Sequence, residues 1–478
     1  NGLNTYRLFY IDGPYTVKFI NINFINGYGP STYSGHGAAI LSNTASNNVK
    51  VNVINSTFND NIASGAATAI CIFGSGSVVT VENSNFTNNK ATGNGASGAI
   101  YTAGTVNIEG SIFINNTATQ NGGAIYGATI TVDSSIFINN TAGANYNGGA
   151  IYGTNININH STFISNTAGV CGGGVYATTK LIVDNSIFDN NILYSDFRGG
   201  EKGGIGIYGG SNSDLTIKNS NFTNHYALNR GTIFGTGNAK LNVSNCNFIK
   251  NIAHDGGAIN IRNSKLYIYN SNFINNEATN IGGAIFSDPS TSGTIEIYDS
   301  NFINNSASNG GAFSIDYGRG TTIIKNSNFI DNSATRGGAI YGTGASMTIS
   351  DSTFINNTNN AIQSLTFDGS TTVSNSNFYS NDIPIIVNSA NTAMGINNCK
   401  FNDDIPSKNY IVGKFTPESG TYISLKDLIA AAGNELYLNG TTYVLDSTIT
   451  ISKNIKIYGG YVKGDDVYST INGGLAYR

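Results

Sequence analysis

Short runs of alternating apolar and polar residues recur along most of the chain, and turns rich in Gly, Asn and Ser separate them. Typical runs are Val106-Asn-Ile108 and Ile156-Asn-Ile158. Alternation with a period of two is typical of short strands that bury one face, and no helical periodicity interrupts it. The pattern therefore predicts an all-β chain.

The runs belong to a repeat with two halves. One half reads Ser-x-Phe-x-x-Asn, as in Ser111 to Asn116, and the other reads Gly-Gly-Ala-Ile, as in Gly122 to Ile125. The Phe recurs, mostly 23 to 29 residues apart, at positions 24, 58, 86, 113, 137, 163, 188, 222, 248, 273, 302, 329, 354, 378 and 401. One such unit cannot bury its apolar face alone, whereas stacked units can. We predict a right-handed parallel β-helix, a solenoid of about fifteen coils with a short helix near the C-terminus.

Stacked coils bring equivalent residues into columns. We expect the Phe residues to stack in the core. Three residues after each Phe, an Asn usually recurs, and an inward Asn at a turn can bond its amide to the next coil. Gly27, His225 and Asp404 are the exceptions. The residue three positions before each Phe is usually Asn, Asp or Gly, which suits a tight corner with positive φ.

The repeats are expected to fill residues 1–417, and residues 418–478 read differently. Leu425 to Gly433 is predicted to form a short amphipathic helix that ends at its Gly. Strands are expected after it at 435–438, 443–445, 449–451 and 455–460.

Composition excludes several functions. Charged residues make up only 11% of the chain and the net charge is −4, which argues against nucleic-acid binding. No apolar run reaches about eighteen residues, so no transmembrane segment is expected. The sequence starts at Asn1, without Met or a signal peptide, as a mature form or an excerpt would. Cys246 and Cys399 replace the repeat Ser about six coils apart, too far for a disulfide, and are read as buried thiols.

Little in the sequence points to catalysis. The residue four before Phe forms an acidic column, with Asn159 inside it, that could hold a cation such as Ca²⁺; its members are Glu82, Glu109, Asp133 and Asp184. A solvated acidic edge is the alternative interpretation. The four His show no metal spacing, and no Ser/His/Asp set emerges. We therefore expect no enzyme activity and no cofactor.

Two outward columns are candidates for binding. An Ile follows the repeat Phe in many coils, notably Ile249, Ile274, Ile303, Ile330 and Ile355. An exposed Ile column would mark lateral packing, although β-propensity on a flat face would also explain it. Tyrosines follow the Gly-Gly-x-Ile element at Tyr101, Tyr126, Tyr152 and Tyr176, and could contact sugar rings if they point outward. The pattern leaves open whether each Tyr or the preceding apolar residue faces inward.

Asn-x-Ser/Thr sequons are abundant, and some could carry glycans in a secreted protein. They begin at Asn55, Asn85, Asn115, Asn139, Asn159, Asn221, Asn242, Asn304, Asn356 and Asn439.

The pairing of Gly-Gly-Ala-Ile with Phe-x-x-Asn resembles the repeats of the polymorphic outer-membrane proteins of chlamydiae. The Asn- and Ile-rich form of the repeat is also similar to the adhesin-like surface proteins of methanogenic archaea. The resemblance covers about residues 20 to 405 and implies a secreted, surface-displayed β-helix used in adhesion or envelope structure. In these families a helix followed by strands usually opens a β-helix, yet here it closes the chain. Residues 418–478 are therefore either a cap, one period of a tandem array, or a segment that a second subunit continues head to tail.

The sequence thus predicts an extracellular structural or adhesin-like protein, at the cell surface or secreted, that associates with itself or with cell-surface glycans. A subunit of an extracellular fibre or sheath and a carbohydrate-active enzyme are the alternatives.

Overall fold

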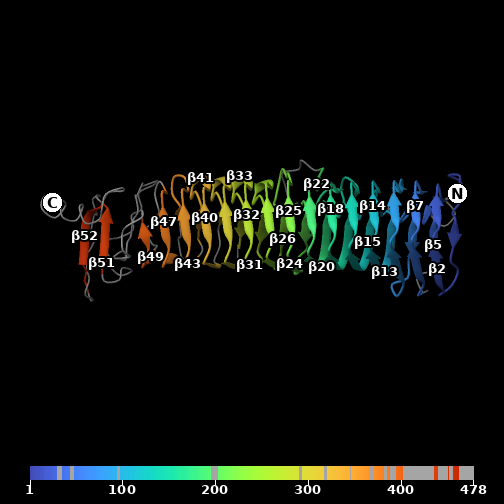
Figure 1. The fold of residues 1–478 in the computed structure, drawn as a ribbon, viewed down its shortest axis with the longest axis horizontal. Helices are drawn as coiled ribbons and strands as arrows, with labels where there is room; N and C mark the ends of the chain where they lie inside the picture. The colour runs from blue at the N-terminus through green and yellow to red at the C-terminus, as the bar shows by residue number, and fades with distance from the viewer. Residues whose placement is uncertain are drawn as a thin grey trace. The chain divides into compact units, whose positions relative to one another are not determined.

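The computed structural model describes residues 1–29, 35–42, 48–93, 97–194, 203–289, 293–316, 320–344, 346–365, 371–381, 385–387, 394–401, 435–439, 450–451 and 456–461. The chain divides into two compact units, Asn1–Asn242 and Val243–Arg478. In each unit the strands lie side by side, coil after coil, and every pairing whose register is recorded is parallel (Figure 1). Both units are therefore parts of a parallel β-solenoid, and the predicted fold class is confirmed.

Each coil of unit 1 has a long side, a short Phe-bearing side and a third side. The long side comprises β1 (Phe9–Tyr10), β2 (Thr16–Ile20), β5 (Ile40–Ser42), β6 (Lys50–Ile54), β9 (Ile70–Ile72), β10 (Val78–Glu82), β13 (Ile100–Glu109), β15 (Ile125–Asp133), β17 (Ile151–Asn159), β20 (Val175–Asp184), β23 (Ile207–Gly209), β24 (Asp214–Lys218) and β26 (Ile233–Thr236). The Phe side comprises β3 (Asn23–Ile25), β7 (Thr57–Asn59), β11 (Asn85–Thr87), β14 (Ile112–Ile114), β16 (Ile136–Ile138), β18 (Thr162–Ile164), β21 (Ile187–Asp189) and β25 (Asn221–Thr223). The third side comprises β4 (Tyr28–Gly29), β8 (Ile62–Ala63), β12 (Lys90–Ala91), β19 (Thr167–Ala168) and β22 (Ile192–Leu193).

Unit 2 repeats this plan, and β27 (Lys240–Ser244) contains the division between the units. Its long side comprises β30 (Ile259–Arg262), β31 (Lys265–Tyr269), β34 (Ile285–Asp288), β35 (Thr294–Tyr298), β38 (Phe313–Ile315), β39 (Thr321–Lys325), β42 (Ile340–Thr343), β43 (Ser346–Ser350), β45 (Ile362–Leu365), β46 (Thr371–Ser374), β48 (Ile385–Val387) and β49 (Met394–Asn397). Its Phe side comprises β28 (Asn247–Ile249), β32 (Asn272–Ile274), β36 (Asn301–Ile303), β40 (Asn328–Ile330), β44 (Thr353–Ile355), β47 (Asn377–Tyr379) and β50 (Lys400–Phe401). Its third side comprises β29 (Ile252–Asp255), β33 (Glu277–Ile281), β37 (Ser306–Asn309) and β41 (Ser333–Arg336).

The number of coils was slightly overestimated from the sequence. All fifteen repeat Phe lie on strands, but the solenoid has about twelve turns. The described residues contain no α-helix. The helix predicted over 425–433 and the strand over 443–445 lie outside them. β51 (Glu435–Asn439) and β52 (Lys456–Tyr461) coincide with two other predicted strands and pair in parallel.

The core contains the Phe stack that the sequence predicted. Neighbouring rings in unit 1 lie with centroids 4.3 to 4.9 Å apart and planes within 12° of parallel. The rings of unit 2 stack in the same way, at 4.7 to 4.9 Å. Offset stacking adds about 0.5–1.5 kcal/mol per aromatic pair to the burial itself.

The Asn that follows each Phe by three residues forms a buried ladder, also as predicted. The Nδ2 of Asn116 donates to Asn140 Oδ1 at 2.9 Å and to the carbonyl of Phe86 at 2.9 Å. The backbone N–H of Asn116 donates to the same Asn140 Oδ1 at 3.1 Å. One amide thus links three consecutive coils, and because each ladder Asn is buried these bonds do not compete with water.

A second ladder, which the sequence did not predict, runs through the Ser two residues before each Phe. The N–H of Ser111 donates to Ser135 Oγ at 3.0 Å, and Ser135 Oγ–H donates to the carbonyl of Asp133 at 2.7 Å. Each Oγ therefore accepts from the preceding coil while it closes the turn of its own coil. Cys246, which takes the place of this Ser in one coil, is buried, and its Sγ lies 3.2 Å from the carbonyl of Ser244.

Both corners that flank the Phe strand are left-handed. The residue three before Phe has positive φ, as the sequence predicted, for example 49° at Asn83 and 52° at Asp351. The residue two after Phe has it too, for example 55° at Asn115 and 56° at Asn275. Asn and Asp tolerate this conformation better than other residues with a Cβ. This local preference explains much of the Asn content.

The buried ladder makes a prediction about stability. Asn140→Ala removes the acceptor of Asn116 and leaves the carbonyl of Phe113 without its Nδ2 donor. Buried polar groups left without partners cost about 1–3 kcal/mol each, so we expect a loss of about 3 kcal/mol or more, measured by urea unfolding. The exposed Asn157→Ala, on the neighbouring coil, should change the stability by less than about 0.5 kcal/mol. Equal effects of the two variants would contradict the ladder's role.

We expect His36 to make the N-terminal coil sensitive to acid. Its Nδ1 accepts the N–H of Ala66 at 2.6 Å, and burial, with Arg7 as a second cause, lowers the pKa of His36 below 6.5. The unfolded chain therefore binds the proton first, and stability falls as the pH drops below 6.5. We expect hydrogen exchange of residues 38–41 and 66–69 to accelerate between pH 7 and 5, once the rates are corrected for the intrinsic slowing of amide exchange at lower pH. His36→Gln keeps an acceptor without titrating and should abolish the effect; an unchanged pH dependence would refute this assignment.

Candidate functional site

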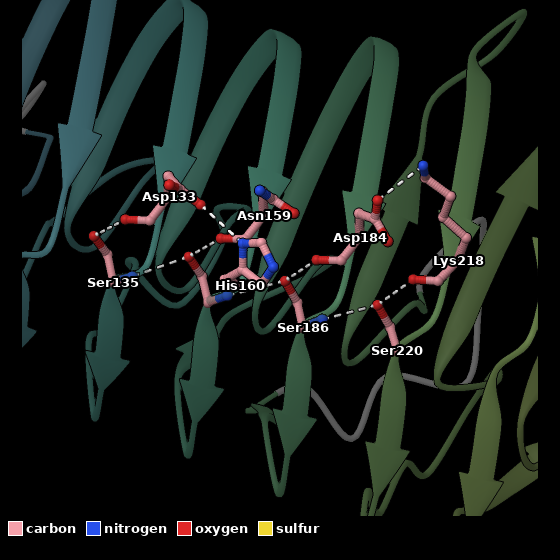
Figure 2. A network of polar contacts seen from close by, with 9 residues as sticks. Asp133, Ser135, Asn159, His160, Asp184, Ser186, Lys218 and Ser220 are labelled. Atoms are coloured by element: carbon pink, nitrogen blue, oxygen red, sulfur yellow. Dashed lines mark hydrogen bonds and ion pairs between the residues drawn. The ribbon is translucent and has the colours of Figure 1, made fainter.

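The acidic column predicted from the sequence exists as a column. Parallel register pairs Glu82 with Glu109, Glu109 with Asp133, Asp133 with Asn159, and Asn159 with Asp184. These residues end the long-side strands just before the corner to the Phe strand. Lys218 continues the column in the next coil, as Figure 2 shows.

The two later acids of the column have basic side chains beside them. Lys218 Nζ lies 2.8 Å from Asp184 Oδ2, and Asn219 Nδ2 donates to Asp184 Oδ1 at 2.8 Å. Desolvation acts to raise the pKa of Asp184, but the bonds from Lys218 and Asn219 outweigh it and leave the pKa below its ordinary value. His160 Nδ1 lies 3.3 Å from Asp133 Oδ1 (Figure 2). Both pairs are substantially exposed, so each adds little stability.

A cation ladder along this column stays a prediction. Within the described ranges, no three His, Cys, Asp or Glu side chains come close enough to hold one metal ion. Glu82, Glu109 and Asp133 share an edge, but a row of carboxylates on a solvated strand end is an ordinary outer face.

The tyrosine column lies outside the apolar core, which answers the question of orientation. Ile100, Ile125, Ile151 and Val175 are buried, and the tyrosine after each is half-buried. The rings of Tyr101, Tyr126, Tyr152, Tyr176 and Tyr208 stack with centroids 4.6 to 5.1 Å apart. Burial and then the neighbouring Tyr126 raise the pKa of Tyr101 and Tyr152. The column presents ring edges and hydroxyls rather than open ring faces, so a sugar could meet only the edges.

The Ile column of unit 2 lies on the outer side of the Phe strands. Ile249, Ile274, Ile303, Ile330 and Ile355 are in register on neighbouring strands and are half-buried. Beside it runs a column that the sequence did not single out, made of Asn247, Asn272, Asn301 and Asn328. The amides of Asn272, Asn301 and Asn328 each donate to the preceding Asn Oδ1 at 2.8 Å. The outward residues of these five strands, an Asn or Thr and then an Ile, are all uncharged.

The sequons differ in exposure. The acceptor Asn is exposed at Asn55, Asn85, Asn115, Asn139, Asn221, Asn304 and Asn356, and half-buried at Asn159 and Asn242. Asn439 lies on β51, where its side chain is outside the description. In four of the exposed sequons the acceptor is the left-handed corner residue and the next Asn is the buried ladder residue, for example Asn115 and Asn116. Glycosylation of any of them stays a prediction.

The cysteines offer no reactive site. All four are buried as free thiols, and burial, partly opposed by Arg7, raises the pKa of Cys71. In the part of the chain that the structure covers, no helix is long and apolar enough to cross a membrane.

Comparisons with known proteins support the repeat. The family model for the Chlamydia polymorphic membrane protein repeat matches residues 110–128, 134–154 and 326–343. These are coils with complete Phe-x-x-Asn and Gly-Gly-Ala-Ile elements, so the chain contains repeats of this kind. No curated protein gives a significant match to the sequence. Among solved structures, a hyperthermoactive exopolygalacturonase from Thermotoga maritima matches at 9% identity and a TM-score of 0.23, over 73% of this chain and 87% of the enzyme. A score this low carries no argument about activity.

The tyrosine column makes a prediction that separates packing from binding. Tyr152→Phe keeps the stacked ring, so we expect the stability to change by less than about 0.5 kcal/mol, whereas Tyr152→Ala should cost about 2–4 kcal/mol in urea unfolding. If the column binds glycans through its hydroxyls, Tyr152→Phe weakens retention on glycan surfaces at unchanged stability. Unchanged stability in Tyr152→Ala would contradict the stacking role.

Proposed function

We propose that this protein is an extracellular surface protein of the adhesin-like kind, whose solenoid displays outer side-chain columns and performs no catalysis. The repeat match carries the proposal, because the matched family is a membrane-protein family of chlamydiae. The resemblance to methanogen adhesin-like proteins points the same way.

The side chains support a scaffold rather than an enzyme. Asp184, the candidate acid with the most contacts, is engaged by Lys218 and Asn219, and Asp133 faces His160. Hydrolysis of a glycoside generally needs two carboxylates free to act as acid and base. The polar ladders satisfy each other coil by coil, which yields a rigid and repetitive display.

Cell-surface display can be tested with antibodies raised against residues 97–194. We expect immunogold particles on the outside of intact source cells, and loss of the label after brief protease treatment. Labelling only after permeabilisation would contradict the proposal.

The absence of catalysis can be tested by measuring the release of reducing ends from polygalacturonate and other acidic glycans. We expect the native chain to release no more than a variant that carries both Lys218→Met and Asp184→Asn. Turnover by the native chain alone would favour the enzyme alternative.

Self-association through the Ile column is the second candidate, since a neutral, regularly spaced face can meet a second copy without charge repulsion. Replacing Ile274, Ile303 and Ile330 together by Ser should lower the apparent mass in sedimentation velocity if copies pack laterally. Replacing Thr294, Thr321 and Thr348 on the long side by Ser is the matched control. Identical sedimentation of all three proteins would exclude this face and leave only end-to-end assembly for a fibre or sheath.

A further inference from the structure

One position of the buried ladder of unit 1 carries an imidazole in place of an amide. His225 stands where other coils carry the ladder Asn, and its side chain is only 1% exposed. Asn191 in the preceding coil points its Nδ2 at His225 Nε2, 3.2 Å away. An imidazole nitrogen thus takes the acceptor place that an amide oxygen holds elsewhere.

The bonds around Asn191 fix which atoms donate. Its Oδ1 accepts from both the backbone N–H and the Nδ2 of Asn166, each at 3.0 Å. Its Nδ2 donates to the carbonyl of Phe163 at 3.0 Å. The second Nδ2 hydrogen therefore points to His225, and the amide cannot flip without breaking the bonds from Asn166. Nε2 must be the unprotonated nitrogen, which leaves the ring proton on Nδ1.

The surroundings match a neutral ring. Gly206 stands where the Gly-Gly-Ala-Ile repeat has Ala, and a methyl group there would lie 3.4 Å from Nε2. The ring of Phe222 stacks on Phe188 in the same pair of coils, at 4.9 Å. The ladder position is thus closed to water.

Charged and titratable residues close to His225 in the sequence or on the paired strand have contacts of their own. Asp189 accepts from Thr223 Oγ1 at 2.6 Å and from Asn224 Nδ2 at 2.8 Å at the outer corner. Tyr226 is 59% exposed, and the guanidinium of Arg230 lies over the ring of Phe234 at 5.3 Å.

We propose that His225 is an acid-sensitive break point in the ladder: a proton at Nε2 sets a donor against the Nδ2 donor of Asn191, and the contact between these two coils opens. A buried bond would be exchanged for two facing donors and an unsolvated charge, both of which are costly. Histidine is the side chain that takes up a proton in the mildly acidic range.

The sign of the pH effect follows from which state binds the proton. In the opened coil the imidazole is solvated and protonates in the ordinary range, near pH 6.5, whereas the closed ladder resists protonation. The opening equilibrium therefore grows as the pH falls below about 6.5, by up to about tenfold per pH unit. Above that range the ladder is fully closed.

His225→Asn is the matched variant, because it restores the residue of the neighbouring coils and removes the titrating group. Hydrogen exchange of the full chain would be measured by mass spectrometry at pH 7.5, 6.5 and 5.5, on peptides that cover residues 187–193 and 221–227. Comparing wild type with variant at the same pH cancels the intrinsic pH dependence of exchange. We expect the ratio of rates to rise by up to tenfold per pH unit below 6.5. His160→Asn, which removes an exposed histidine, should behave as wild type.

A second measurement needs no variant. Exchange of the imidazole C2 hydrogen reports ring protonation residue by residue, and His225 in the folded chain should exchange with a lower midpoint pH than in urea-unfolded chain. Equal midpoints in the two states would overturn the proposal. So would amide exchange that changes with pH identically in wild type and in His225→Asn.

Discussion

The hydrogen bond from the side-chain amide of each buried Asn to the next is the interaction on which the rest of the coil geometry depends. It joins a side chain to its counterpart one coil later and to a carbonyl one coil earlier, so the spacing between coils is set at that point. Parallel strands alone would permit slippage in register. With Oδ1 and Nδ2 both committed, a coil that slipped by one residue would leave several buried polar groups without partners. The Phe stack and the Ser ladder keep the same register as the Asn ladder, because all three lie in one block of seven residues. This block runs from the corner residue three before Phe to the ladder Asn three after it.

Because the buried polar groups bond to each other, the outer side chains are not needed to hold the coils together. The Asn and Ser ladders join the coils through neutral side chains, so the residues of the outer columns can vary without breaking these contacts. In unit 1 they include an acidic edge that ends in the Asp184–Lys218 pair, and in unit 2 an uncharged face of Asn and Ile. Neighbouring columns can thus differ in chemistry while the backbone beneath them is the same, as suits a surface that meets an extended partner.

Much of this could be predicted from the residues, and the exceptions have physical causes. The Phe and Asn columns and the corner before Phe follow from periodicity and from the tolerance of Asn for positive φ. The corner after Phe escaped prediction because its residue with positive φ is not always Asn: Ser165 and Lys250 hold the same place. The role of Ser in the second ladder depends on where Oγ points, which no sequence period encodes. Tyr152 and Ile151 alternate, so the sequence could not say which enters the core; the structure buries Ile151. The partner of Asp184 was visible as a column member, but the ion pair with Lys218 spans 34 residues and one coil, and only the fold brings the two together.

The two left-handed corners have a consequence for how such a chain can change over time. The block from the first corner to the ladder Asn has the same length in every coil, because both corners and both ladders must coincide. The middle of the long side, where its two strand segments meet, varies in length from coil to coil. The strand register shifts there between Thr102 and Thr105, and again between Gly153 and Asn155. Length variation is therefore channelled into that junction and into the stretch between the ladder Asn and the following Gly-Gly. During evolution those segments could lengthen, or whole coils could be gained and lost, while the buried ladders and the Phe stack keep their contacts. The architecture separates a part that must be copied faithfully from a part that is free to diversify.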